Sequence, residues 1–114
     1  MRVPRDAVLL RIFVGEDDKL DRTPLYEAIV LKAREQKLAG ATVLRGPLGF
    51  GHSSTLHTTK ILRLSADLPI VVEIVDAPEK IEAFLPLLDA MMPSGLVTIE
   101  KVQVLQYGEQ RNGK

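Results

Sequence analysis

The segment from Leu44 to Ser54, LRGPLGFGHSS, holds the residue types in this chain that are best suited to binding chemistry. Its glycines Gly46, Gly49 and Gly51 would let the backbone approach a ligand closely and aim successive N–H groups at an anion. The alternative is a plain hairpin in which the glycines supply backbone freedom alone. The segment is neither a P-loop nor a dinucleotide fingerprint, because it lacks Gly-Lys-Ser/Thr and enters no helix.

Basic side chains flank this segment. Arg45 precedes the glycines, and Lys60 and Arg63 follow them, so each could pair with phosphate oxygens. His52 could contact the same ligand, or it could be an exposed loop histidine. Ser53 stands beside it, but a nucleophile and its base must be oriented by a third group, and we predict no catalytic residue here.

A metal site within one chain is not expected. The chain has no cysteine and two histidines, and no carboxylate lies close to them in sequence before Asp67. A three-fold axis could still gather three copies of one histidine. Neither a metal nor a required cofactor is therefore predicted.

Length and composition predict one domain covering residues 1–114. The 15 basic and 15 acidic side chains cancel, so no net field draws the protein to nucleic acid. The lack of cysteine suits a reducing compartment. The N-terminal apolar run of eight residues is too short to span a bilayer, and we expect a cytoplasmic protein.

The first half of the chain predicts a strand, a helix and a second strand. Residues 7–15 are aliphatic at nearly every position, which indicates a central strand with both faces largely covered. Thr23 and Pro24 are typical of a helix start, and Gly40 of a helix end, so a helix is predicted over 23–39. Residues 41–46 predict the second strand, and residues 47–66 a flexible loop.

The second half repeats this plan. PIVVEIVD, residues 69–76, predicts a strand. Asp76 and Glu79 resemble a capping pair that begins a helix, and Pro86 should kink that helix. Residues 96–107 predict the last strand, whose alternation changes phase near Lys101; this indicates a bulge or two covered faces. Residues 108–114 predict a mobile tail.

The order βαββαβ predicts a ferredoxin-like α+β sandwich, with an antiparallel four-stranded sheet and both helices on one face. This plan leaves the other face of the sheet bare. The strands are too apolar for that face to meet water, and a large apolar face normally marks a partner. Self-association is the simplest explanation.

The motifs GPLGFGHSSTLHT, DLPIVVEIVD and GLVTIEKVQV resemble the small PII-like signalling proteins, in the branch long filed as a domain of unknown function. The resemblance covers residues 7–107. It implies a homotrimer that holds an adenine nucleotide (AMP, ADP or ATP) in clefts between subunits. It places Gly46, Gly49, Phe50 and Gly51 at the base of a signalling loop, and Gly95 in a second ligand-contacting turn.

The chain also departs from the PII pattern. The turn MMPSGL keeps Gly95 but has no lysine to grip phosphate, and the loop has no tyrosine to be nucleotidylated. The resemblance therefore implies a non-enzymatic sensor without the detailed PII switch. Its loop would regulate a membrane transporter or an enzyme. The alternatives are a small trimeric enzyme acting on a phosphorylated metabolite, and a metal-binding structural trimer of the CutA kind.

Overall fold

The computed structural model describes residues 3–50 and 67–108. The described elements are β1 (Asp6–Gly15), β2 (Lys19–Leu20), β3 (Thr23–Pro24), α1 (Leu25–Glu35), β4 (Thr42–Arg45), β5 (Pro69–Asp76), α2 (Pro78–Met91) and β6 (Leu96–Gln103). Neither described helix is long and apolar enough to cross a membrane.

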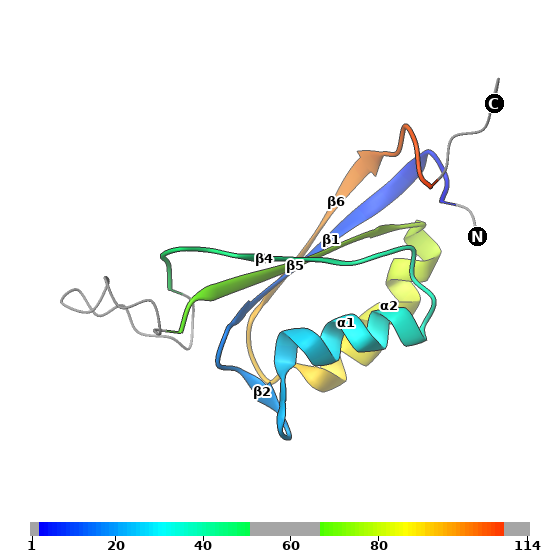
Figure 1. The fold of residues 1–114 in the computed structure, drawn as a ribbon. Coiled ribbons are helices and arrows are strands. Elements are labelled where there is room, and N and C mark those ends of the chain that lie inside the picture. The colour runs from blue at the N-terminus through cyan, green and yellow to red at the C-terminus, as the bar shows by residue number, and fades with distance from the viewer. Residues whose placement is uncertain (1–2, 51–66, 109–114) are drawn as a thin grey trace.

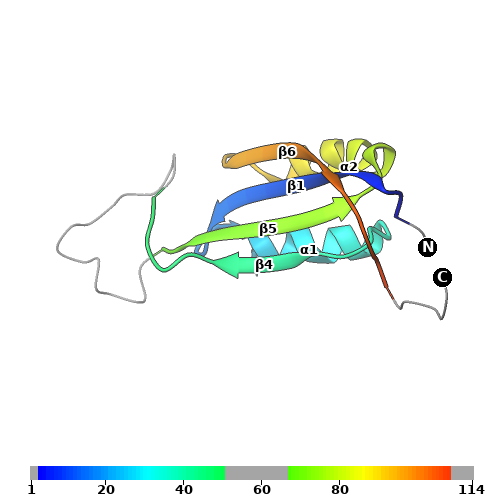
Figure 2. The ribbon, with the colours of Figure 1, turned by 90° about the horizontal axis from the view of Figure 1, so that it is seen from above.

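Four strands form one antiparallel sheet in the order β4-β5-β1-β6. Both helices lie under one face of it, and the opposite face carries no helix (Figure 1). We call this opposite face the helix-free face; it is turned toward the viewer in Figure 2. The predicted ferredoxin-like sandwich is confirmed.

The core lies between the sheet and the two helices. Alternate residues of β1 and β5, such as Leu10, Ile12 and Val72, are fully buried because they point toward the helices. Ile29 of α1 and Phe84 of α2 meet them at the helical spacing that the sequence predicts. The prediction that both faces of the first strand are largely covered is confirmed on the helix side, and on the other side its side chains are intermediate in exposure within one chain.

The first helix is shorter at both ends than predicted. Thr23 and Pro24 pair with Lys19–Leu20 in a two-stranded ribbon, so Pro24 becomes the N-cap and Thr23 makes no cap. The helix ends at Glu35, well before Gly40. Lys37 then takes a positive φ of 63°, and its carbonyl accepts a hydrogen bond from Lys80 Nζ at 2.7 Å.

Asp76 does not form the predicted capping pair with Glu79, because the N-cap of α2 is Ala77. The Asp76 side chain is fully buried and joins two segments. Its Oδ1 accepts from the backbone N–H of Ala77 at 2.7 Å, and its Oδ2 accepts from that of Ala39 at 2.8 Å. The same local sequence therefore fits either a helix cap or, as observed, an acceptor for the N–H of a distant residue.

The last strand also ends earlier than predicted, at Gln103. Its pairing with β1 is continuous, so the change of alternation near Lys101 is not a bulge, and both faces of β6 are largely exposed. The four residues Val104–Tyr107, here called the strap, leave the sheet and cross its helix-free face near the start of β1 and the end of β5 (Figure 2).

Candidate functional site

The predicted binding segment leaves the sheet at the end of β4. Directly after Arg45, the backbone N–H of Gly46 donates to the carbonyl of Pro69 at 2.8 Å. This bond ties the start of the loop to the first residue of β5. We call this part of the molecule the loop-base end; of the predicted loop, residues 51–66 lie outside the described residues.

Gly46 and Gly49 both pack against the ring of Pro69. A Cβ added to Gly46 would lie 2.8 Å from Pro69 Cγ, and one added to Gly49 would lie 3.1 Å from the same atom. Neither glycine has a positive φ. The described structure therefore gives these glycines a packing role, and their predicted role in approaching a ligand stays a prediction.

Phe50 is the last described residue before the gap, and its side chain is 68 % exposed. Leu48 beside it is also exposed. Neither side chain joins the core, so both are open to contact with a ligand or another chain. An exposed aromatic ring at this place is compatible with the predicted contact to a nucleotide base.

The loop-base end is more acidic than the sequence suggested. Asp67 Oδ1 accepts from the backbone N–H of Asp17, and Asp18 accepts from that of Gly15, each at 2.8 Å. The predicted phosphate partner Arg45 is not free, because its guanidinium pairs with the carboxylate of Glu16. These four carboxylates oppose an anion, so phosphate binding here would depend on cations from other segments.

The sequence reasoning missed this acidic cluster because Asp67 stands 50 residues after Asp17, and the paired Arg45 is also distant from the run. Glu16 stands 29 residues before Arg45. The pairing of Gly15 with Pro69 brings the two segments together. The polar run EDDK after the first strand was the available signal. Within the described ranges, no three His, Cys, Asp or Glu side chains could hold a metal ion.

Gly95 lies at the same end of the sheet but at the opposite edge. The next residue, Leu96, begins β6 and pairs with Phe13 near the end of β1. Gly95 has a φ of +132°, and a Cβ there would lie 2.9 Å from the carbonyl oxygen of Phe13. The turn therefore requires glycine for its own geometry, whatever it binds.

One chain does not bring the two predicted halves of the site together. β4 and β6 are separated by three strand spacings, about 14 Å. A groove of about 630 Å³ beside Gly95 is lined by residues that include Leu85, Leu88, Val97 and Glu82. No described residue of the loop base lines it.

Four of the predicted site residues lie outside the described ranges. They are Gly51, His52, Lys60 and Arg63. Of the predicted flexible loop 47–66, residues 51–66 lie there too. Of the predicted site, Arg45, Gly46, Gly49, Phe50 and Gly95 are described, and all five are at the loop-base end of the sheet.

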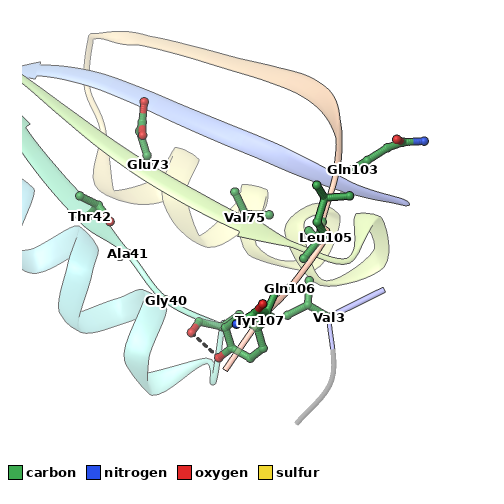
Figure 3. Close-up of a pocket in the computed structure, with 12 residues that line it drawn as sticks. Val3, Gly40, Ala41, Thr42, Glu73, Val75, Gln103, Leu105, Gln106 and Tyr107 are labelled. Carbon is green, nitrogen blue, oxygen red and sulfur yellow. Dashed lines mark hydrogen bonds between the residues drawn. The ribbon is translucent and has the colours of Figure 1, made fainter. Parts of the chain in front are cut away.

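A second pocket, which the sequence reasoning missed, lies at the other end of the sheet. Its volume is about 580 Å³, and its walls are the strap, the residues Ala39–Thr42 and the β5 residues Glu73 and Val75 (Figure 3). The Tyr107 hydroxyl donates to the carbonyl of Ala39 at 2.7 Å, and this bond holds the strap across the pocket. Tyr107 was assigned to a strand, so its reach toward the first helix was not predicted.

Known proteins resemble this chain over nearly all its length. Residues 7–104 match the family model DUF190, described as "Uncharacterized ACR, COG1993". A UPF0166 protein of Aquifex aeolicus is 40 % identical over 105 residues, which cover 92 % of this chain and 98 % of the relative. A UPF0166 protein of Methanocaldococcus jannaschii is 33 % identical over 99 residues, covering 86 % and 91 %. The chain therefore belongs to the DUF190 family.

Proposed function

We propose that this protein is a PII-like sensor that works without catalysing a reaction. Three copies assemble, and an adenine nucleotide binds in the clefts between them. The loop after β4 changes its order on binding and engages a membrane transporter or an enzyme. The proposal rests on the predicted PII-like resemblance and on the observed fold. Membership of the DUF190 family, described as uncharacterised, adds no activity.

One observation carries the proposal. The loop base and the Gly95 turn lie at the same end of the sheet but at its two opposite edges. A cyclic assembly brings the β4 edge of one copy close to the β6 edge of the next, so that both ligand-contacting segments can face one cleft. A single chain keeps them about 14 Å apart.

The charge of the loop-base end sharpens the proposal. A phosphate that binds Arg45 competes with Glu16 for its guanidinium. Exposed ion pairs of this kind contribute about 0.2–1 kcal/mol, so removing the competing carboxylate should tighten nucleotide binding by about 1.4- to 5-fold. Glu16→Gln makes this change with almost no change in size.

The test is a thermal-shift screen with AMP, ADP and ATP, followed by calorimetric titration of the nucleotide that stabilises most. Glu16→Gln should bind more tightly than the wild type, and a Lys60→Ala/Arg63→Ala double variant should bind at least about tenfold more weakly. Arg34→Ala, an exposed cation on α1, is the matched control and should not differ from the wild type.

Absence of binding at millimolar nucleotide would remove the ligand from this proposal. Release of phosphate from ATP at a rate that depends on His52 would favour the small enzyme. Tight binding of a divalent metal without nucleotide binding would favour the alternative hypothesis of a metal-binding structural trimer of the CutA kind.

A further inference from the structure

The helix-free face is apolar around a charged centre. Leu44 and Leu96 on this face are 48 % and 55 % exposed. At its middle, Arg11 Nε pairs with Glu73 Oε2 at 3.0 Å and Arg11 Nη1 with Glu100 Oε1 at 3.1 Å. Because Arg11 is already paired within its own chain, a partner can cover this centre without leaving that cation unpaired.

The strap adds a projection to this face. Leu105 is 83 % exposed, more than any other large hydrophobic side chain in the described ranges. Two bonds hold the strap in place: Val104 N–H donates to the Arg5 carbonyl at 2.7 Å, and the Tyr107 hydroxyl donates to the Ala39 carbonyl at 2.7 Å. Leu105 therefore stands exposed at the rim of the pocket beneath the strap, which it also lines, on a segment fixed near both ends.

The pocket beneath the strap is the matching hollow. It lies on the same face, because Glu73 and Val75 of its lining point away from the helices, and Gly40 and Ala41 leave its wall with little side-chain bulk (Figure 3). A Cβ added to Gly40 would meet nothing within 4 Å, so the space beside this wall is empty in a single chain. Val75 contributes an apolar floor.

We propose that the occupant of this hollow is a second copy of the chain, and that Leu105 of one copy enters the strap pocket of its neighbour. A surface that carries both a projection and a hollow repeats its contact from copy to copy, and a cyclic assembly satisfies every contact. The formal net charge of zero lets copies approach without net repulsion. This inference rests on the self-association in the proposed function and names the residues that carry it.

The test measures assembly by sedimentation velocity and light scattering over a dilution series. Leu105→Ser removes the projection from an exposed site, so folding should be unchanged. Burying a leucine lowers the dissociation constant of a contact by at least about tenfold. Loss of the leucine from all three contacts of a trimer should therefore lower the overall association constant by at least about 10³-fold. Leu31→Ser, at a leucine 61 % exposed on α1, is the matched control and should assemble like the wild type.

Tyr107→Phe tests the hydrogen bond that holds the strap separately from the exposed leucine. It removes one hydroxyl and keeps Leu105, so assembly should weaken by a smaller factor, about 2- to 10-fold per contact. Val75→Phe fills the floor of the hollow and should weaken assembly while leaving Leu105 in place.

If the wild type is a trimer and the Leu105→Ser trimer is as stable as the Leu31→Ser trimer, this inference is overturned and the sensor proposal stands. A wild-type chain that stays monomeric at high micromolar concentration would overturn both. Loss of nucleotide binding with intact, Leu105-dependent assembly would overturn the nucleotide proposal alone.

Discussion

Replacing Gly46 by alanine tests why this residue is small. The added Cβ would lie 2.8 Å from Pro69 Cγ, whereas ordinary contacts begin at 3.4 Å, so the two groups must separate by about 0.6 Å. The hydrogen bond from Gly46 N to the Pro69 carbonyl resists that separation. Overpacking of this kind costs about 1–3 kcal/mol of the free energy of unfolding.

Gly40→Ala is the control for this substitution, and both are made in the Leu105→Ser chain, so that no neighbouring side chain enters the hollow beside Gly40. Neither glycine has a positive φ, and a Cβ at Gly40 would meet nothing within 4 Å. Both substitutions gain the same benefit from a less flexible unfolded chain, about 0.4–1 kcal/mol. That benefit cancels in the comparison, so Gly46→Ala should be about 1–3 kcal/mol less stable than Gly40→Ala.

Urea unfolding followed by circular dichroism measures the difference. Adding Pro69→Ala to Gly46→Ala removes the offending Cγ, and the double variant should recover about 1 kcal/mol relative to the sum of the single variants. Equal stabilities of Gly46→Ala and Gly40→Ala would refute the packing argument. If Gly46→Ala then still abolished nucleotide binding, close approach of a ligand would be the reason for the glycine.

Two further stability predictions use the same assay. Asp76→Ala should lower the free energy of unfolding by about 3 kcal/mol or more, because the part-buried N–H groups of Ala39 and Ala77 each lose an acceptor worth about 1.5–3 kcal/mol; a loss below about 1 kcal/mol would contradict this. Gly95→Ala should cost about 2 kcal/mol or more, because its φ of +132° disfavours any Cβ and the Phe13 carbonyl lies 2.9 Å from it. A melting temperature within 2 °C of the wild type would count against the Gly95 prediction.

The strands of this fold were predictable because their signals are local and strong. β1 and β5 are nearly continuous apolar runs, and each was found within one residue of its observed bounds. In α2, Ile81, Phe84 and Leu88 recur in the sequence at helical spacing, and all three are buried. Burial of a periodic apolar pattern depends little on the details of the partner.

The errors arose where pairing with another segment, nearby or distant along the chain, decided the local structure. Thr23 has the chemistry of an N-cap, but pairing with Leu20 takes it into a ribbon. Asp76 has the position of a cap, but Ala39, 37 residues away, takes one of its oxygens. The same cause hid the pairing of Arg45 with Glu16, which depends on the sheet register alone.

The place of β1 at the centre of the sheet has a consequence for synthesis of the chain. β1 is made first, yet its two neighbours in the sheet, β5 and β6, are the last two strands to be made. From Gly15 at the end of β1 to Gln103 at the end of β6, a ribosome adding 5–20 residues per second takes roughly 4–18 s. For that time the apolar strand lacks at least one sheet partner. The finished sheet therefore cannot protect it from aggregation while the chain is being made.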